Sequence, residues 1–289
     1  MSRMLGSLRK ASRIPHAEVA MLSTGTVVAG RYRLEERVAH GATSDLWRCV
    51  DEANGRTVAM NILAPILLEQ PGFADQVRAQ ARAMASIDHP GIVVVYECVI
   101  GQTADPVAFL VTEFVEGESL ARILARVGCL TPARTMSLVA QVAEALHAGH
   151  EKGFVHGRVK PADIMIRPDD TVVLTSFGVA PSVEAAGLVV GGGTYIAPEQ
   201  AFGEPATHLV YIYTLGLVAY QCLAGRRPFE GESPLERAMR LVREQAPPLP
   251  PEVPANVSAI VERALARHPS DRWPSGASLA QAARVASYS

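Results

Sequence analysis

The chain has 289 residues, of which 48% are hydrophobic and 19% charged, with 27 Lys and Arg against 29 Asp and Glu. This composition is typical of a folded protein of about two domains or lobes, because it supplies enough apolar surface for a core and excludes disorder on composition. The net charge of -2 gives no global signature of nucleic-acid binding. The four cysteines lie far apart without a Cys-x-x-Cys pair, which indicates a reducing compartment and not a disulfide scaffold.

Residues 30–115 are predicted to form a sheet with one helix. Alternating, β-branched and short apolar runs predict four strands, at residues 32–38, 57–63, 92–100 and 108–114. Between residues 71 and 88 the apolar residues recur at steps of three and four, which predicts a helix with one face on the sheet. We interpret this part as a small β-rich lobe.

Residues 116–289 have a mainly helical pattern. It predicts helices at residues 119–127, 132–152, 208–224, 234–244, 257–266 and 275–286, with short strands at 164–167 and 172–175. The longest apolar run, residues 209–224, is shorter than the roughly 18 to 20 residues of a membrane span, so we expect a buried helix. The proline-rich segment 246–254 is predicted to be a stiff linker, with a ligand for a polyproline-reading domain as the alternative.

Residues 1–29 are predicted to be a basic arm. They contain Arg3, Arg9, Lys10 and Arg13 and lack the continuous apolar core of a signal peptide. We expect a flexible, solvated segment. The alternative is a juxtamembrane segment on the cytoplasmic side of a membrane span outside this chain, where basic residues are enriched.

Nine short motifs occur in order along the chain. They are Val58-Ala59-Met60, His89-Pro90-Gly91-Ile92-Val93, Glu113-Phe114-Val115-Glu116-Gly117, His156-Gly157-Arg158-Val159-Lys160-Pro161-Ala162-Asp163-Ile164, Ser176-Phe177-Gly178, Ala197-Pro198-Glu199-Gln200, Leu215-Gly216, Pro228-Phe229-Glu230-Gly231 and Asp271-Arg272-Trp273. With them the chain resembles the Ser/Thr protein kinases of actinobacteria. The resemblance implies a two-lobed α+β fold, with an N-lobe over residues 30–115 and a helical C-lobe over residues 116–289.

The resemblance also assigns nucleotide-binding roles to positions whose residues differ from those of the family. The lysine that holds the phosphates is Asn61, and its glutamate partner on the long helix is Gln80. The aspartate that binds the first magnesium ion is Ser176, and the asparagine that binds the second is Asp163. The glycine-rich loop keeps only Gly41 of its three glycines, so side chains crowd the backbone where phosphate would lie.

The catalytic loop differs as well. The family's His-Arg-Asp sequence reads His156, Gly157 and Arg158, and an arginine cannot act as a general base. Loss of general acid–base help alone costs about 10²- to 10⁴-fold in rate. The aspartate that braces this loop from the buried helix aligns with Tyr211.

Residues that hold the family fold are present. The resemblance implies that His156 and Phe177 pack between the lobes with Met84, and that Glu199 and Arg272 form a buried ion pair. We expect only a vestigial adenine pocket, with no cofactor; its residues are Ala59, Thr112, Glu113, Val115 and Met165. No metal is expected either, because the eight histidines show no His-Glu-x-x-His spacing.

These differences predict a catalytically inactive pseudokinase, a scaffold and not an enzyme. Two alternatives stay open: a weak nucleotide sensor, and a residual enzyme with an unorthodox phosphate or metal site around Arg158, Lys160 and Asp163. For that cluster the plainer interpretation is internal neutralisation, with Arg158 paired to Asp163 or turned to solvent.

The chain also resembles the intracellular pseudokinase domains attached to mycobacterial lipid II flippases. That resemblance implies a cytoplasmic module in the control of peptidoglycan synthesis, phosphorylated by an active receptor-type Ser/Thr kinase and then bound by a phosphothreonine-reading FHA-domain protein. A flippase would lie outside this chain, and no nucleic-acid partner is expected. Ser182 and Thr194, in a glycine-rich activation-type segment, are the candidate phosphosites. Further candidate threonines are Thr24, Thr26, Thr43, Thr171 and Thr207.

Overall fold

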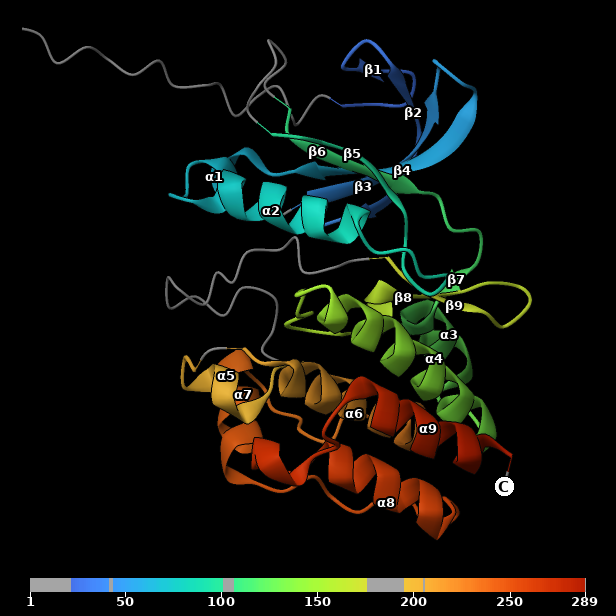
Figure 1. The fold of residues 1–289 in the computed structure, drawn as a ribbon, viewed down its shortest axis with the longest axis vertical. Helices are drawn as coiled ribbons and strands as arrows, with labels where there is room; N and C mark the ends of the chain where they lie inside the picture. Colours follow the sequence, from blue (N-terminus) through green and yellow to red (C-terminus); the bar gives the residue numbers. More distant parts are fainter. Residues whose placement is uncertain (1–21, 42–43, 101–106, 176–194, 205, 289) are drawn as a thin grey trace, which may run out of the picture.

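The computed structural model describes residues 22–41, 44–100, 107–175, 195–204 and 206–288, which form two lobes (Figure 1). The N-lobe contains an antiparallel sheet in the order β1-β2-β3-β4-β6-β5. Its strands are β1 (Val27–Val28), β2 (Tyr32–His40), β3 (Ser44–Asp51), β4 (Arg56–Leu63), β5 (Val95–Val99) and β6 (Phe109–Glu113). The predicted α+β kinase-like fold is confirmed.

One face of the N-lobe sheet is covered by α2 (Phe73–Ala85), which follows the short helix α1 (Pro65–Leu68) (Figure 1). Phe73, Val77, Ala81 and Met84 are the buried residues of α2, and their spacing of three and four residues places them on one face. The periodicity of the sequence therefore predicted both the helix and its buried side.

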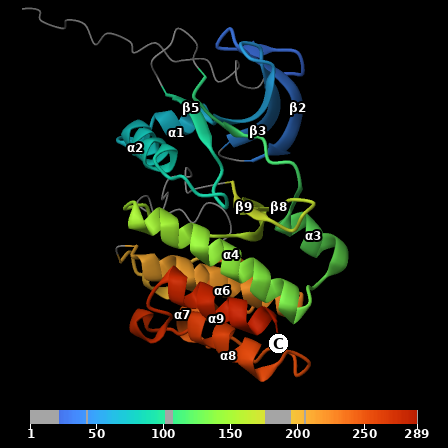
Figure 2. The same ribbon diagram turned by 45° about the vertical axis from the view of Figure 1, so that its right-hand side comes forward.

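The C-lobe is mainly helical and carries a small sheet on the side that faces the N-lobe (Figures 1 and 2). The strands of that sheet are β7 (Glu118–Ser119), β8 (Ile164–Ile166) and β9 (Val172–Leu174). The helices are α3 (Leu120–Val127), α4 (Pro132–Glu151), α5 (Pro198–Ala201), α6 (His208–Ala224), α7 (Pro234–Arg243), α8 (Ala255–Ala264) and α9 (Gly276–Ser287).

Helix α6 forms the centre of the C-lobe. Every residue from Val210 to Tyr220 is buried, because α4 and α8 pack against it (Figure 2). The continuous apolar run of the sequence is thus explained by burial on all sides. In the described part of the chain, no helix is long and apolar enough to cross a membrane.

Helices α4 and α9 lie unusually close to each other. A Cβ atom at Gly276, the first residue of α9, would lie 2.5 Å from the carbonyl oxygen of Ala143 on α4. Only glycine permits this approach. The N-cap of α9 is Ser275, whose hydroxyl accepts a hydrogen bond from the amide of Ser278.

Several elements differ from the sequence prediction, since the short elements β1, β7, α1 and α5 were not predicted. Strand β3 was not predicted, although its residues alternate between half-buried and buried from Leu46 to Asp51. The strand predicted at residues 92–100 begins only at Val95, because Ile92 and Val93 join the lobes instead. Val93 donates to the carbonyl of Leu174 at 3.0 Å, and the Leu174 amide donates to Gly91 at 2.9 Å. Tertiary pairing with β9 therefore overrides the local β pattern.

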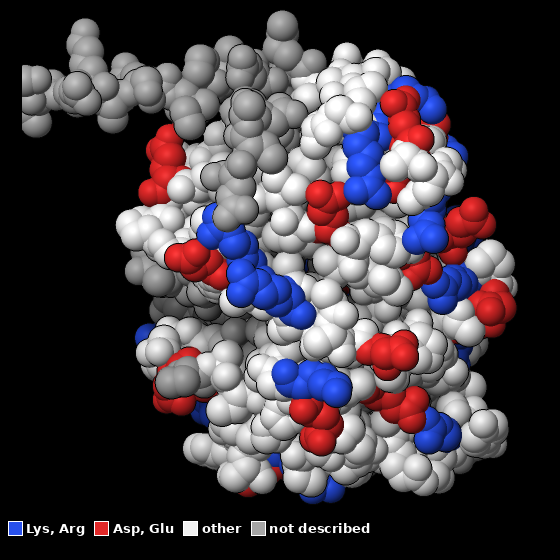
Figure 3. All heavy atoms as spheres, turned by 45° about the horizontal axis from the view of Figure 1, so that its top comes forward, with Lys and Arg blue, Asp and Glu red and all other residues white. Residues whose placement is uncertain are grey.

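Charges of both signs are interspersed on the face drawn in Figure 3. On the N-lobe, Arg33 pairs with Glu52 at 3.0 Å and Arg48 with Glu35 at 3.5 Å. Mixed surface charge of this kind serves solubility more than stability.

Candidate functional site

The phosphate-binding positions lie on β4 and α2. Asn61 is half-buried on β4, where it is paired in register with Leu46 on β3 and Leu110 on β6. Gln80 is half-buried on α2. Both side chains are neutral amides, so they offer a nucleotide hydrogen bonds but no charge to offset its phosphates.

The predicted adenine pocket is built by the N-lobe sheet and by β8. Ala59 on β4 is paired with Thr112 on β6, and Val115 is buried just after that strand. Met165 is half-buried on β8. The predicted pocket residues thus come from the N-lobe sheet and from the small C-lobe sheet that faces it (Figure 1).

An ion pair at the hinge was not predicted. The Arg167 guanidinium donates to a carboxylate oxygen of Glu113 at 2.6 Å, with both side chains about 30% exposed. Beside this pair lies an open hollow of about 440 Å³, lined by Glu113, Phe114, Glu116, Arg167, Pro168 and Asp169. The pair connects the hinge to the end of β8. The sequence showed only two distant charges, 54 positions apart.

The catalytic loop is held by backbone contacts. His156 is only 2% exposed, and its Nδ1 accepts a hydrogen bond from the Arg158 amide at 3.3 Å. The side chain of Gln200 on α5 donates to the Gly157 carbonyl at 2.8 Å. The Arg158 side chain is half-buried and carries a permanent positive charge. A phosphate group would meet a cation here where the family has a carboxylate.

Lys160 and Asp163 are brought together by the short 3₁₀ turn Pro161–Asp163. Lys160 Nζ lies 3.8 Å from Asp163 Oδ1, and the Asp163 side chain is only 5% exposed. The Asp163 carbonyl accepts the Thr175 amide at 2.9 Å, which joins the loop to the end of β9. The cation paired with Asp163 is thus Lys160 and not Arg158. A lysine and a carboxylate at this spacing are suited to contact a phosphate and a divalent cation.

Thr214, and not Tyr211, braces the catalytic loop from α6. The Val159 amide donates to Thr214 Oγ1 at 3.3 Å, and both groups are buried. Tyr211 is fully buried, but its ring faces His150 and His208, and burial raises the pKa of its hydroxyl. Sequence reasoning missed Thr214, although a hydroxyl inside an otherwise apolar helix was the available signal.

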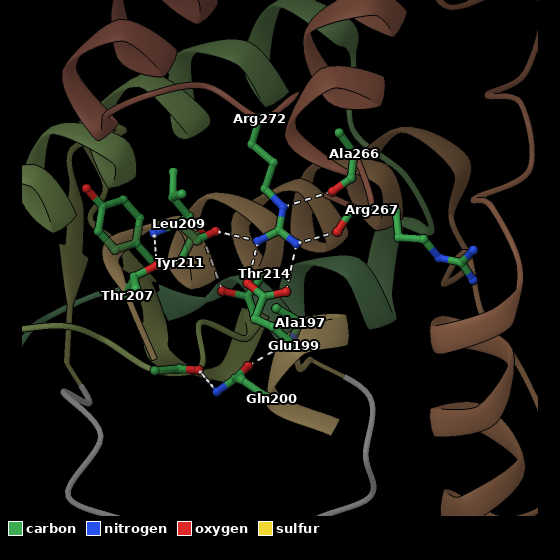
Figure 4. Close-up of polar contacts among 11 residues, drawn as sticks. Ala197, Glu199, Gln200, Thr207, Leu209, Tyr211, Thr214, Ala266, Arg267 and Arg272 are labelled. Carbon is green, nitrogen blue, oxygen red and sulfur yellow. Dashed lines mark hydrogen bonds and ion pairs between the residues drawn. The ribbon is translucent and has the colours of Figure 1, made fainter. Parts of the chain in front are cut away.

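The structure places Glu199 and Arg272 together in a buried network (Figure 4). The two guanidinium NH groups reach the two carboxylate oxygens at 2.6 and 2.8 Å. The guanidinium also donates to the carbonyls of Leu209, Ala266 and Arg267, so all of its donors have acceptors. This network fixes α5 and the start of α6 to the segment before α9.

Several predicted site residues lie outside the described residues. They are Ser176, Phe177, Ser182 and Thr194, together with Ala42 and Thr43 of the glycine-rich loop. For these positions the interpretation remains that of the sequence.

A β-rich N-lobe above a mainly helical C-lobe that carries the loop of His156 and Asp163 is the architecture of a protein kinase-like protein. The chain belongs to the protein kinase domain family, whose profile matches residues 32–283. Serine/threonine-protein kinase PknA of Mycobacterium tuberculosis is 39% identical over 265 residues, covering 89% of this chain and 62% of PknA. Serine/threonine-protein kinase PknB of the same organism is 34% identical over 271 residues, covering 89% of this chain and 43% of PknB.

Solved structures show the same fold. The kinase domain of Mycobacterium tuberculosis PknI superposes with a TM-score of 0.74 at 22% identity, covering 92% of this chain and 99% of that domain. The chain spans less than two thirds of the length of the PknA and PknB relatives.

The relatives correct one prediction. The expectation that this chain is not an enzyme is contradicted, because relatives at 34–39% identity over most of the chain are Ser/Thr protein kinases. The prediction relied on counting lost charges at positions 61, 158 and 176. It gave too little weight to Lys160 and Asp163, which remain in place and in contact range.

Proposed function

We propose that this kinase-family domain is a phosphorylated docking module in a Ser/Thr kinase pathway. An active receptor-type Ser/Thr kinase phosphorylates it, and an FHA-domain protein then binds the phosphothreonine through charge-assisted hydrogen bonds. The observation that carries the proposal is the intact C-lobe frame, with Glu199 and Arg272 in a fully hydrogen-bonded pair. A docking module needs a rigid frame and an accessible hydroxyl. It does not need the phosphate-binding lysine and the catalytic aspartate that the family has at the positions of Asn61 and Arg158.

Among the described threonines, Thr24 suits phosphorylation best. It is exposed in the turn before β1. The Thr171 hydroxyl instead donates to Asp169 at 2.7 Å, so a phosphate there would meet a like charge. Thr207 caps α6 by accepting from the Leu209 amide. Ser182 and Thr194 remain predicted phosphosites outside the described residues.

The proposed setting is the cytoplasmic control of peptidoglycan synthesis. Mycobacterial kinases are among the relatives, which supports an actinobacterial signalling pathway. In this proposal the module is attached to a membrane flippase for lipid II that lies outside this chain, so that phosphorylation recruits the FHA-domain protein to the membrane.

The test separates phosphate acquired from another kinase from phosphate that the chain transfers to itself. We would incubate the purified chain with ATP and magnesium, alone and with a catalytic amount of an active receptor-type kinase, and map the phosphate by mass spectrometry. We expect phosphothreonine in the second reaction and calorimetric binding of an FHA domain to that product. Thr24→Ala and the matched variant Thr171→Ala identify the site. A product that carries phosphothreonine but does not bind any FHA domain would refute the docking role.

A second candidate function is phosphoryl transfer or nucleotide sensing at an altered centre. The Lys160 and Asp163 pair supports it, as do the Ser/Thr kinase relatives. The reaction with ATP and magnesium alone tests it, because phosphate that appears without the second kinase and disappears in Asp163→Asn comes from this chain.

A further inference from the structure

Three potential metal ligands gather at the C-terminal end of α4, away from the nucleotide pocket. His147, His150 and Glu151 lie on one helix face, at spacings of three and four residues. One ligand atom from each residue lies within 4.8 Å of those of the other two. The cluster was not predicted, because the histidines were taken to show neither His-Glu-x-x-His nor paired ligand spacing, although His147 and His150 are three residues apart.

The two imidazoles have buried nitrogens whose hydrogen-bonding capacity is unused. Among the described residues, the Nδ1 atoms of His147 and His150 have no hydrogen-bond partner, although both atoms are buried. Buried polar atoms are nearly always satisfied, and an unsatisfied one points to an ion, a water or a functional role. Both histidines of the cluster therefore keep a ring nitrogen that no protein group in the described part of the chain uses.

Neighbouring helices contact both histidines. His150 stacks on His208 at the start of α6, with 4.5 Å between ring centroids and 28° between planes. His208 is itself held, because its Nε2 donates to the Pro274 carbonyl at 2.9 Å. His147 lies against α9, since a Cβ atom at Gly276 would be 2.9 Å from the His147 Cβ. The His150 ring is therefore held by stacking, the Cβ of His147 lies against α9, and Glu151 is exposed.

We propose that His147, His150 and Glu151 bind a zinc-type divalent transition metal, with water completing the coordination. Two imidazole nitrogens and one carboxylate oxygen are a ligand set that suits zinc, whereas magnesium and calcium prefer oxygen ligands alone. Ligand atoms of a tetrahedral zinc ion lie about 3.3 Å apart, given zinc–ligand distances of about 2.0 to 2.2 Å. Binding therefore requires side-chain rotations that bring the three ligand atoms closer together than the 4.8 Å limit of the present arrangement.

The first measurement is calorimetric titration of the whole chain with zinc chloride, with cobalt(II) absorption as a spectroscopic probe of the same site. We expect one ion per chain and a tetrahedral cobalt spectrum. His147→Gln and His150→Gln should each weaken zinc binding at least about tenfold. Glu151→Gln should weaken it too, and this exposed residue leaves packing intact, so a folding defect cannot explain the loss.

Two matched variants control for other ligands. His268→Gln removes an exposed histidine outside the cluster, and Cys129→Ser removes an exposed thiol. Both should bind zinc as the parent chain does. A parent chain that binds neither ion overturns the proposal, as does zinc binding that survives in the His150→Gln, Glu151→Gln double variant or is lost in Cys129→Ser.

Discussion

At the scale of single residues, the C-lobe depends on buried polar groups whose partners all come from elsewhere in the chain. Arg272 is 1% exposed and reaches Glu199 from 73 positions away. The centroid of the Tyr213 ring lies 4.8 Å from the Arg272 guanidinium. Burial raises the pKa of the Tyr213 hydroxyl, and the positive charge of Arg272 offsets only part of this rise. Removing one member leaves the other charged and buried, which is the costly case.

Arg272→Met should therefore lower the free energy of unfolding by about 3 to 5 kcal/mol. Methionine keeps much of the side-chain volume but leaves the Glu199 carboxylate without its partner. Urea denaturation followed by circular dichroism measures the change. Arg240→Met, which removes an exposed pair with Glu236, serves as the control and should have little measurable effect. Equal losses in the two variants would contradict the assigned role of the buried pair.

The contact between Thr214 and the catalytic loop gives a second prediction at this scale. Thr214→Val keeps the shape of the side chain but leaves the buried Val159 amide without its acceptor, at a cost of about 1 to 3 kcal/mol. Hydrogen exchange should show lost protection at the Val159 amide. Tyr211→Phe, one turn away on the same helix, should leave that protection unchanged. Lost protection in both variants would mean that α6 braces the loop by packing and not through the Thr214 hydroxyl.

At the scale of elements, an ion-pair network connects β2, β3 and β5 of the N-lobe sheet. Arg31, just before β2, binds Asp51 at the end of β3 at 2.7 Å and Glu97 on β5 at 3.3 Å. The hydrogen bond from Arg31 is the main cause that lowers the pKa of Asp51. Tyr32 also donates to Glu97, which joins β2 to the opposite edge of the sheet.

This network predicts an acid dependence of stability. A carboxyl group with a lowered pKa in the folded state stabilises the fold above its ordinary value of about 3.9, and that contribution is lost as the pH falls below it toward the folded pKa. Arg31→Gln should lower stability at neutral pH and flatten the decline below about pH 4. Melting temperatures measured across pH test this. Arg33→Gln, at an exposed neighbouring pair, should keep the acid slope of the parent chain.

At the scale of the whole molecule, the residues predicted to form a nucleotide pocket come from both lobes and differ in the charge that they offer a nucleotide. The hinge side carries Thr112, Val115 and the Glu113–Arg167 pair, whereas Asn61 and Gln80 offer phosphates no positive charge. Binding should therefore be weak and should depend on Lys160, Asp163 and a divalent cation.

We accordingly expect millimolar ATP with magnesium to raise the melting temperature slightly, and ATP without metal to raise it less, since binding to the folded state alone stabilises it. Asp163→Asn should abolish the metal-dependent part. Arg240→Gln changes a residue on α7, outside the catalytic loop, and this variant should retain the metal-dependent shift. A metal-dependent shift that survives in Asp163→Asn would exclude this carboxylate as the metal ligand.

The spacing of apolar residues predicted most of the longer helices and strands, because this local pattern depends only on residues that are close together in the sequence. The spacing of Phe73, Val77, Ala81 and Met84 predicted α2 and its buried face, and the apolar run at residues 209–224 predicted the buried helix α6. The two lobes were predicted differently, from the family resemblance that the nine ordered motifs carry. Nearly all of the fold class could be predicted from the sequence by these two signals.

Contacts between distant segments were decided only by the tertiary structure. The packing of the elements places Thr214, and not Tyr211, against the catalytic loop, and it places Arg167 beside Glu113. It also brought His208 and Gly276 against the two histidines at the end of α4. Which distant side chains come into contact depends on how the elements pack together, and the spacing of residues along the chain does not predict this.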